Sequence, residues 1–250
     1  DRNDVLLYTI YKDKNRTPIK LSDIPESVKL ATLAAEDAEF YSHIGFSIRG
    51  MFRALSKNLS QGKLQGGSTI TQQLVKNALL SSEKTYIRKI RELILSLGVE
   101  IAYSKDEILE MYLNEVSYGG TTYGIQEASR HYFNKNVQDL TLSEAALLAG
   151  LPQSPTLYSP FGNHPDLTFS RQREVLHLMQ VNKFISSDEE EKTKNERITF
   201  APNKQNILAP HFVMYIREKL IEKYGEEVVS KGGLTVKTTL DINIQLLAEE

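Results

Sequence analysis

The sequence predicts a mainly α-helical protein, with short β elements only at the N- and C-terminal ends of its 250 residues. Two capping boxes, Ser104-x-x-Glu107 and Thr141-x-x-Glu144, each mark a helix start, because the hydroxyl and the glutamate satisfy free backbone amides there. Val5–Ile10 has the composition of a short strand, and Leu234–Leu240 alternates as a strand does. Hydrophobic residues make up 40% of the chain, enough for a sizeable core.

Helical signals occupy most of the remaining chain. Asp23 and Pro25 mark the start of the first helix, and Gly225 is suited to follow a helix C-terminus. Ser60–Gly67 has no apolar period and is predicted to be a mobile loop. The expected helices are Glu26–Phe40, Ser47–Leu59, a segment capped by Ser68, Lys84–Tyr103, the two that follow the capping boxes, Asp166–Phe184 and Pro210–Tyr224. The expected buried side of Lys84–Tyr103 carries Tyr86, Ile90, Ile94, Leu97 and Ile101.

Composition narrows the classes of function. The chain has no cysteine, which excludes disulfides and thiolate metal sites, and its five histidines show no metal-ligand spacing. No apolar run approaches the roughly 20 residues that a membrane-spanning helix needs. Because the sequence begins at Asp1 without a methionine, we expect a fragment of a longer protein with a membrane anchor upstream.

Charge is unevenly distributed along the chain. The net charge is −2, but Arg49–Arg91 contains nine lysines or arginines and the single acid Glu83, a surplus of eight. Such a surplus is typical either of an anion-binding segment or of a solvated basic face. The acidic balance of the remainder argues against a general nucleic-acid-binding protein.

The first cluster suited to chemistry contains Glu36 and Asp37, followed by Phe40 and His43. Partial desolvation at this helix end would raise the pKa of one carboxylate and make it a proton acceptor near neutral pH. An ordinary polar helix terminus would have the same composition, so the cluster alone leaves both interpretations open.

The second cluster is Gly66–Asn77, with the sequence GGSTITQQLVKN. A glycine loop that runs into a helix start presents free backbone amides to an anion, with hydroxyls and Lys76 nearby. It is not a Walker loop, because no lysine precedes Ser68. A capped helix with a flexible entry is the alternative.

The third cluster is Arg88-Lys89-x-Arg91-Glu92. Arg88 and Glu92 stand four residues apart on one helical face, which is compatible with a surface ion pair. Guanidinium groups are also suited to phosphate oxygens, because their donors are planar and bidentate.

Together and in this order, these motifs resemble the glycosyltransferase family 51 domain. That domain is the peptidoglycan glycosyltransferase of class A penicillin-binding proteins and of monofunctional strand polymerases. The family motif E-D-x-x-F-x-x-H-x-G matches Glu36–Gly45, G-G-S-T-I-T-Q-Q-x-x-K-N matches Gly66–Asn77, and R-K-x-x-E matches Arg88–Glu92. I-L-E-x-Y-L-N matches Ile108–Asn114, and L-A-G-L-P-Q-x-P matches Leu148–Pro155. The resemblance covers roughly residues 20–180.

The resemblance implies catalytic roles for two residues. Glu36 is similar to the general base that deprotonates the 4-hydroxyl of the incoming lipid II sugar. That hydroxyl attacks the growing chain with inversion, and undecaprenyl pyrophosphate leaves. Glu92 is similar to a second acidic residue that orients the cations or stabilises the partner of the leaving group. The residues then expected to bind substrate are Asp37, His43, Arg53, Ser68, Thr69, Gln72, Gln73, Lys76, Asn77, Lys84, Arg88, Lys89 and Arg91.

The resemblance also implies a domain organisation. The family fold is a lysozyme-like large helical lobe with a smaller, mobile, membrane-proximal lobe. Residues 1–20 are expected to form an N-terminal strand and connector after a missing membrane anchor, and residues 21–200 the glycosyltransferase domain. Residues 201–250 are expected to form a linker into an absent transpeptidase domain, because the chain from Asn206 onward resembles that linker of a multifunctional enzyme.

The partners that the resemblance implies are lipid II, the growing glycan chain, the membrane surface and moenomycin-type inhibitors, without nucleic acid. No cofactor is expected to bind tightly, and a divalent cation, Mg²⁺ or Mn²⁺, is expected to assist only at the pyrophosphate. The expected location is the extracytoplasmic (periplasmic) face of a bacterial cell membrane, in cell-wall synthesis.

Two other functions remain compatible with the residues. A lysozyme-like glycan hydrolase or lytic transglycosylase would also use one dominant glutamate, but it needs an acid for its leaving oxygen. A non-catalytic module that binds lipid pyrophosphates would need only the cations. The Glu36-Asp37 pair argues against the second alternative.

Overall fold

The structure of the protein is a computed structural model that describes residues 1–8, 16–46, 67–80, 86–162, 164–202, 208–225, 228–229 and 235–249. Contacts divide the chain into two compact units, residues 16–201 and residues 1–15 with 202–250. The predicted helix Ser47–Leu59, nearly all of the predicted loop Ser60–Gly67, and the candidate residues Arg53 and Lys84 lie outside the described residues.

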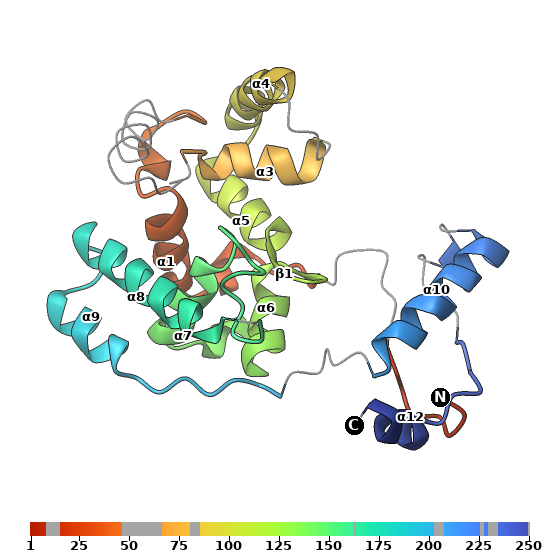
Figure 1. Cartoon of the computed structure of the whole chain (residues 1–250). Coiled ribbons are helices and arrows are strands. Elements are labelled where there is room, and N and C mark those ends of the chain that lie inside the picture. Colours follow the sequence, from red (N-terminus) through yellow and green to blue (C-terminus); the bar gives the residue numbers. More distant parts are fainter. Residues whose placement is uncertain are drawn as a thin grey trace. The chain divides into compact units, whose positions relative to one another are not determined.

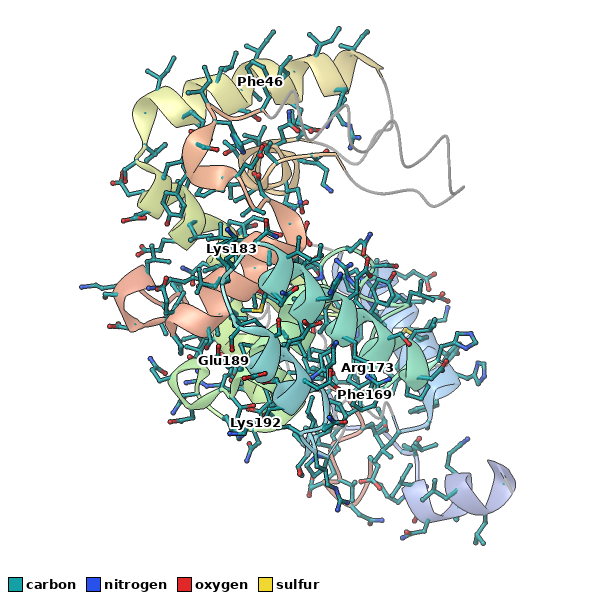
Figure 2. The ribbon with its side chains drawn as sticks, turned by 90° about the vertical axis from the view of Figure 1, so that its left-hand side faces the viewer. Phe46, Phe169, Arg173, Lys183, Glu189 and Lys192 are labelled. Carbon is teal, nitrogen blue, oxygen red and sulfur yellow. The ribbon has the colours of Figure 1, made fainter. Side chains whose placement is uncertain are left out.

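The larger unit is built almost entirely of helices, which confirms the mainly α class (Figure 1). Its short 3-10 helices are Leu21–Asp23, Phe40–Ser42 and Val137–Asp139. Its α-helices are α1 (Glu26–Glu36), α3 (Ile70–Leu79), α4 (Tyr86–Ala102), α5 (Lys105–Glu115), α6 (Ile125–Phe133), α7 (Leu142–Gly150), α8 (Pro165–Val181) and α9 (Ser187–Lys194). Figure 2 shows α8 with Phe169 and Arg173, and α9 with Glu189 and Lys192, at the opposite end of this unit from α4.

Helix starts follow the capping chemistry of the sequence. The boxes at Ser104 and Thr141 form as predicted and begin α5 and α7. The prediction for α3 is wrong by one residue, because Thr69 rather than Ser68 forms the box with Gln72. The first helix also ends earlier than predicted, at Glu36, and a separate 3-10 turn contains Phe40.

The β structure lies where the sequence did not predict it. β1 (Ser117–Gly119) and β2 (Thr122–Tyr123) form an antiparallel pair between α5 and α6. The described parts of the two predicted terminal strands, residues 5–8 and 235–240, are not strands. Each makes an isolated backbone bond instead, Leu208 N–H to the Leu7 carbonyl and Arg2 N–H to the Leu240 carbonyl, so no ladder forms.

The smaller unit contains α10 (Pro210–Tyr224) and α12 (Ile242–Glu249). α10 has the predicted bounds, and Gly225 follows it with a φ of 81°. Leu7 packs with Ala209, Val213 and Ile242, so the first residues of the chain are held by apolar contacts with the C-terminal segment rather than by a sheet.

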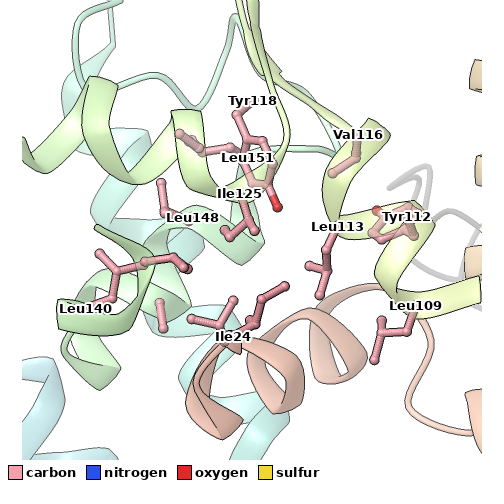
Figure 3. Close-up of a cluster of buried hydrophobic side chains, with 14 of the residues drawn as sticks. Ile24, Leu109, Tyr112, Leu113, Val116, Tyr118, Ile125, Leu140, Leu148 and Leu151 are labelled. Atoms are coloured by element: carbon pink, nitrogen blue, oxygen red, sulfur yellow. The ribbon is translucent and has the colours of Figure 1, made fainter. Parts of the chain in front are cut away.

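The core of the larger unit is enclosed by α1, α5, α6 and α7 (Figure 3). Leu109 and Leu113 of α5 face Ile24, while Ile125 of α6 and Leu148 of α7 close the other side. Two tyrosines, Tyr112 and Tyr118, are also among its most deeply buried side chains. A second apolar cluster lies between α1, α7 and α8. These contacts fix α1, whose last residue is Glu36.

Helix α4 buries the opposite face from the one predicted. Ile90, Ile94 and Ile101 are 59%, 62% and 88% exposed, so the predicted buried stripe is wrong. The buried positions are polar, Glu92 and Ser96, and the carboxylate of Glu100 is covered as well. They are four residues apart, and the glutamates have lysine partners, Lys89 for Glu92 and Lys105 for Glu100, which makes a polar buried face tolerable.

Glycine at position 124 is required by backbone geometry, which generates a stability prediction. Gly124 precedes α6 with a φ of +78°, and an added Cβ would lie 2.8 Å from the carbonyl oxygen of Asn114. We expect Gly124→Ala to lower the free energy of unfolding by about 1–3 kcal/mol in urea titrations.

Gly98→Ala is the matched control. Gly98 lies within α4, and apart from the nearby backbone of the same helix, no atom of the described residues lies within 4 Å of an added Cβ. The same substitution should therefore stabilise the protein by about 0.5–1 kcal/mol. Equal effects of the two substitutions would contradict the steric interpretation of Gly124.

Candidate functional site

The candidate site is built around Glu36 at the C-terminal end of α1. Its Oε2 accepts a hydrogen bond of 2.6 Å from Nε2 of Gln73, which lies on α3. Its Oε1 is buried, and no donor among the described residues bonds to it. One oxygen of the carboxylate is therefore held by Gln73, and the other makes no hydrogen bond within the described residues.

Burial raises the pKa of Glu36 above its ordinary value of 4.5, because the charged carboxylate loses hydration. The hydrogen bond from Gln73 and the positive charges of Arg171 and Lys76 act in the opposite direction, and the charge of Asp37 adds to the increase. A carboxylate with a raised pKa is a better proton acceptor near neutral pH. The environment of Glu36 is therefore compatible with the general base that the sequence predicts at this position.

Three residues beside Glu36 were not among the predicted site residues. Arg171 of α8 is only 6% exposed, and its Nη1 lies 2.8 Å from Glu174. Tyr112 and Tyr118 are buried, and burial together with the charge of Glu36 raises the pKa of both phenols. The signal that would have revealed Arg171 is its place four residues before Val175 on a buried stripe of α8.

Asp37 joins the end of α1 to the start of α3. Its Oδ2 accepts a hydrogen bond of 3.1 Å from the backbone amide of Ile70, the first residue of α3. His43 Nε2 lies 3.0 Å from both carboxylate oxygens of Asp37. Asp37 and His43, both predicted to bind substrate, are thus brought together in a contact that orders the loop after α1.

Thr69 and Gln72 lie at the start of α3, and both are buried. The Thr69 hydroxyl donates to the backbone carbonyl of Gly45 over 2.7 Å, and the side-chain Oε1 of Gln72 accepts from the Thr69 backbone amide over 3.1 Å. Their polar atoms therefore hold the helix start in place, and the side chain of Gln73, one residue further, reaches Glu36.

Glu92, the second predicted catalytic residue, is 1% exposed, and its carboxylate contacts Lys89 Nζ. Lys89 Nζ also donates to the Ser68 hydroxyl over 3.0 Å, so the second and third sequence clusters meet here. Lys89, three residues before Glu92 on the same helix, is thus a cationic partner of this carboxylate. The resemblance implies two alternative roles for Glu92. Its burial beside Lys89 favours the role in which it orients a cation.

The remaining predicted residues differ in exposure. Lys76, Asn77 and Arg91 are exposed, and Arg88 is partly buried. Lys76 acts electrostatically on Glu36. Within the described part of the chain, no group of three or more acidic or histidine side chains could hold a metal ion.

Comparisons with known proteins identify the family to which the chain is similar. The transglycosylase family matches residues 3–180. Penicillin-binding protein 1F of Bacillus subtilis (strain 168) is 40% identical over 255 residues, 99% of this chain and 35% of that protein. Penicillin-binding protein 1A of Neisseria lactamica is 42% identical over 244 residues, 96% of this chain and 30% of that protein. The chain thus spans 30–35% of the length of these relatives.

A crystal structure of penicillin-binding protein 1A from Haemophilus influenzae has a similar fold. The TM-score is 0.53 at 23% sequence identity, over 91% of this chain and 24% of that chain. At this identity the likeness concerns the fold alone. It agrees with the mainly α architecture expected from the sequence.

The raised pKa of Glu36 predicts a pH-dependent cost to stability. Ionising a carboxylate whose pKa is higher in the folded state favours unfolding, and this cost is complete above the folded pKa. We therefore expect Glu36→Gln to be more stable than the unchanged protein in thermal melts at pH 8.

This gain should disappear as the pH falls below 4.5, the ordinary pKa of glutamate. The Glu36 carboxyl is then neutral in both the folded and the unfolded protein. Glu26→Gln, at the exposed N-terminal end of α1, is the control and should show no such gain. A gain for Glu36→Gln that is the same at both pH values would contradict the raised pKa.

Proposed function

Because the chain belongs to the transglycosylase family, we propose that it polymerises lipid II into peptidoglycan strands, with inversion and release of undecaprenyl pyrophosphate. In this proposal the chain is the glycosyltransferase part of a class A penicillin-binding protein. The observation that carries it is the enclosed Glu36 carboxylate, with one oxygen bound by Gln73 and the other unbonded by the described residues.

The proposed chemistry uses Glu36 as a general base. The 4-hydroxyl of the incoming sugar transfers its proton to Glu36 as its oxygen bonds to the anomeric carbon of the growing chain. The bond from that carbon to the pyrophosphate breaks, and the electron pair leaves with the phosphate oxygen. A pyrophosphate is a good leaving group, so the site must neutralise charge rather than donate a proton.

The cations along α3 and α4 are suited to that task. Lys76, Lys89 and Arg91 are exposed, while Glu92 and Ser68 contact Lys89 Nζ. Phosphate oxygens would replace water around these cations. A divalent cation, if it takes part, would arrive with the pyrophosphate, as the sequence predicts. A moenomycin-type inhibitor is expected to compete for the same cations.

Helix α4 supports a proposed location at a membrane surface. Ile90 and Ile94 are 59% and 62% exposed, and Leu93 and Leu95 are also exposed. An exposed apolar face of this size marks a surface that meets an apolar phase, and the lipid tail of the proposed substrate lies in one. Within the described residues, no helix is both long and apolar enough to cross a bilayer. The proposed side of the membrane is the extracytoplasmic face, which the resemblance to glycosyltransferase family 51 implies.

The activity is tested with labelled lipid II and a divalent metal, by following strand length over time. We expect the unchanged chain to make polymer, and Glu36→Gln to be at least about a hundredfold slower because it cannot accept the proton. Glu26→Gln should polymerise normally, since Glu26 is an exposed residue at the other end of α1.

Two outcomes would overturn the proposal. Cleavage of preformed glycan by the unchanged chain would identify a hydrolase or lytic transglycosylase. Binding of lipid II without turnover by the unchanged chain would identify a non-catalytic module.

The membrane contact is tested by co-sedimentation with phosphatidylglycerol vesicles. Burial of one large apolar side chain contributes about 1.5–3 kcal/mol. The double substitution Ile90→Asn and Ile94→Asn should therefore weaken binding by tenfold or more. Val181→Asn is the matched control, because Val181 is exposed at the end of α8. Equal binding by the double variant and the control would contradict a role for α4.

A further inference from the structure

Glu36 lies at the end of a chain of side chains from three helices. Tyr112 of α5 is 1% exposed, and its hydroxyl lies 3.4 Å from Oε1 of Gln73. Nε2 of the same amide donates to Glu36 over 2.6 Å. The contact with Tyr112 is the longer and weaker of the two, but it is made in a buried setting where few competing partners exist.

The orientation of the Gln73 side-chain amide determines whether its NH₂ group or its oxygen faces the Glu36 carboxylate. An amide presents an NH₂ group at one end and an oxygen at the other, and only the NH₂ group can donate to a carboxylate. A rotated amide would turn its oxygen toward Glu36, which would disfavour the ionised form needed in a base. When Glu36 has taken up a proton, its own hydroxyl could donate to that oxygen, so Glu36 alone does not fix the amide throughout a reaction.

We propose that Tyr112 is a positioning residue whose hydroxyl donates to Gln73 Oε1 and so keeps the Gln73 NH₂ group directed at Glu36. The proposal rests on the proposed function, because it concerns the base of that reaction. Tyr112 acts through Gln73 and does not itself contact the substrate in this arrangement.

The charges around Tyr112 favour this donor role. Burial and the charges of Glu36 and Asp37 keep the phenol protonated by raising its pKa well above 10, and Tyr118 acts in the same direction. A phenol that stays protonated remains a donor at every pH at which the base could work. The hydroxyl therefore returns the amide to the same orientation after each proton transfer.

The other groups that face Glu36 must be considered together with Tyr112. They are Gln73 and Lys76 from α3, Tyr118 from β1, Arg171 from α8 and the adjacent Asp37. Removing the Tyr112 hydroxyl changes none of these charges. A change in the titration of Glu36 would then indicate a change in the orientation of the Gln73 side-chain amide.

The test compares Tyr112→Phe with Tyr132→Phe. Tyr132 is also 1% exposed, but its hydroxyl donates to the backbone carbonyl of Tyr118 over 2.7 Å instead of to Gln73. The titration of Glu36 is followed by ¹³C NMR on the side-chain carboxyl of labelled glutamate. Its midpoint should move to higher pH in Tyr112→Phe and stay in place in Tyr132→Phe, because only the former frees the amide to rotate.

The rate of polymer formation should follow the same pattern. One neutral hydrogen bond corresponds to a change of about threefold to tenfold, so Tyr112→Phe should be slower by that factor near neutral pH. The acidic limb of its pH–rate profile should also move to higher pH. In a Gln73→Met background, Tyr112→Phe should have no further effect on the Glu36 midpoint, because the amide that connects them is gone.

Three results would overturn the inference. They are an unchanged Glu36 midpoint in Tyr112→Phe, an equal shift in the Gln73→Met background, and a Tyr112→Phe protein that does not fold, since the hydroxyl would then serve the fold itself. Failure of the proposed function is separate: the NMR titration needs no turnover, so it decides the inference even if the chain makes no polymer.

Discussion

The hydrogen bond from the Ile70 amide to the Asp37 carboxylate is the contact on which the candidate site depends. The first amides of a helix have no partner within it, and a carboxylate there is also favoured by the helix dipole. Asp37 directly follows Glu36, so anchoring Asp37 at the start of α3 places the end of α1 beside that helix. Gln73, one turn into α3, can then reach Glu36. Two adjacent carboxylates thus have different surroundings: Asp37 bonds to the backbone of α3, and Glu36 bonds to the Gln73 side chain.

The surroundings of Glu36 act on its pKa in two opposite directions. Burial in a core with Tyr112 and Tyr118 makes its charge unfavourable, and this is the origin of the raised pKa. Gln73 and the buried Arg171 reduce the cost without removing it. Groups tuned in this way are common in active sites, because a base must be ionised and still basic near the working pH. The same contacts therefore pack the core and raise the pKa of Glu36.

Helix α4 combines buried charged side chains with exposed apolar ones. Its buried face is polar and its exposed face apolar, the reverse of the usual arrangement of a surface helix. Glu92 and Glu100 are held under Lys89 and Lys105, so the buried carboxylates are compensated. A lipid-linked pyrophosphate has an apolar tail beside an anionic head. A helix with exposed isoleucines and with cations close by has the complementary surface.

The sequence by itself determined the mainly α class, the capping boxes at Ser104 and Thr141 and the motif residues around Glu36, because these depend on short-range backbone chemistry and on local patterns. The tertiary structure alone decided which face of α4 is buried, because that is the face that packs against α3, where the Thr71 hydroxyl bonds to the Glu100 carboxylate. It also decided that the described residues at the two ends, 1–8 and 235–249, form no sheet, since a strand needs a neighbour with which to pair. A local pattern could place Arg171 on a buried stripe of α8, but only folding brings its charge near Glu36 and the Tyr112 hydroxyl near Gln73, because these helices are far apart in sequence.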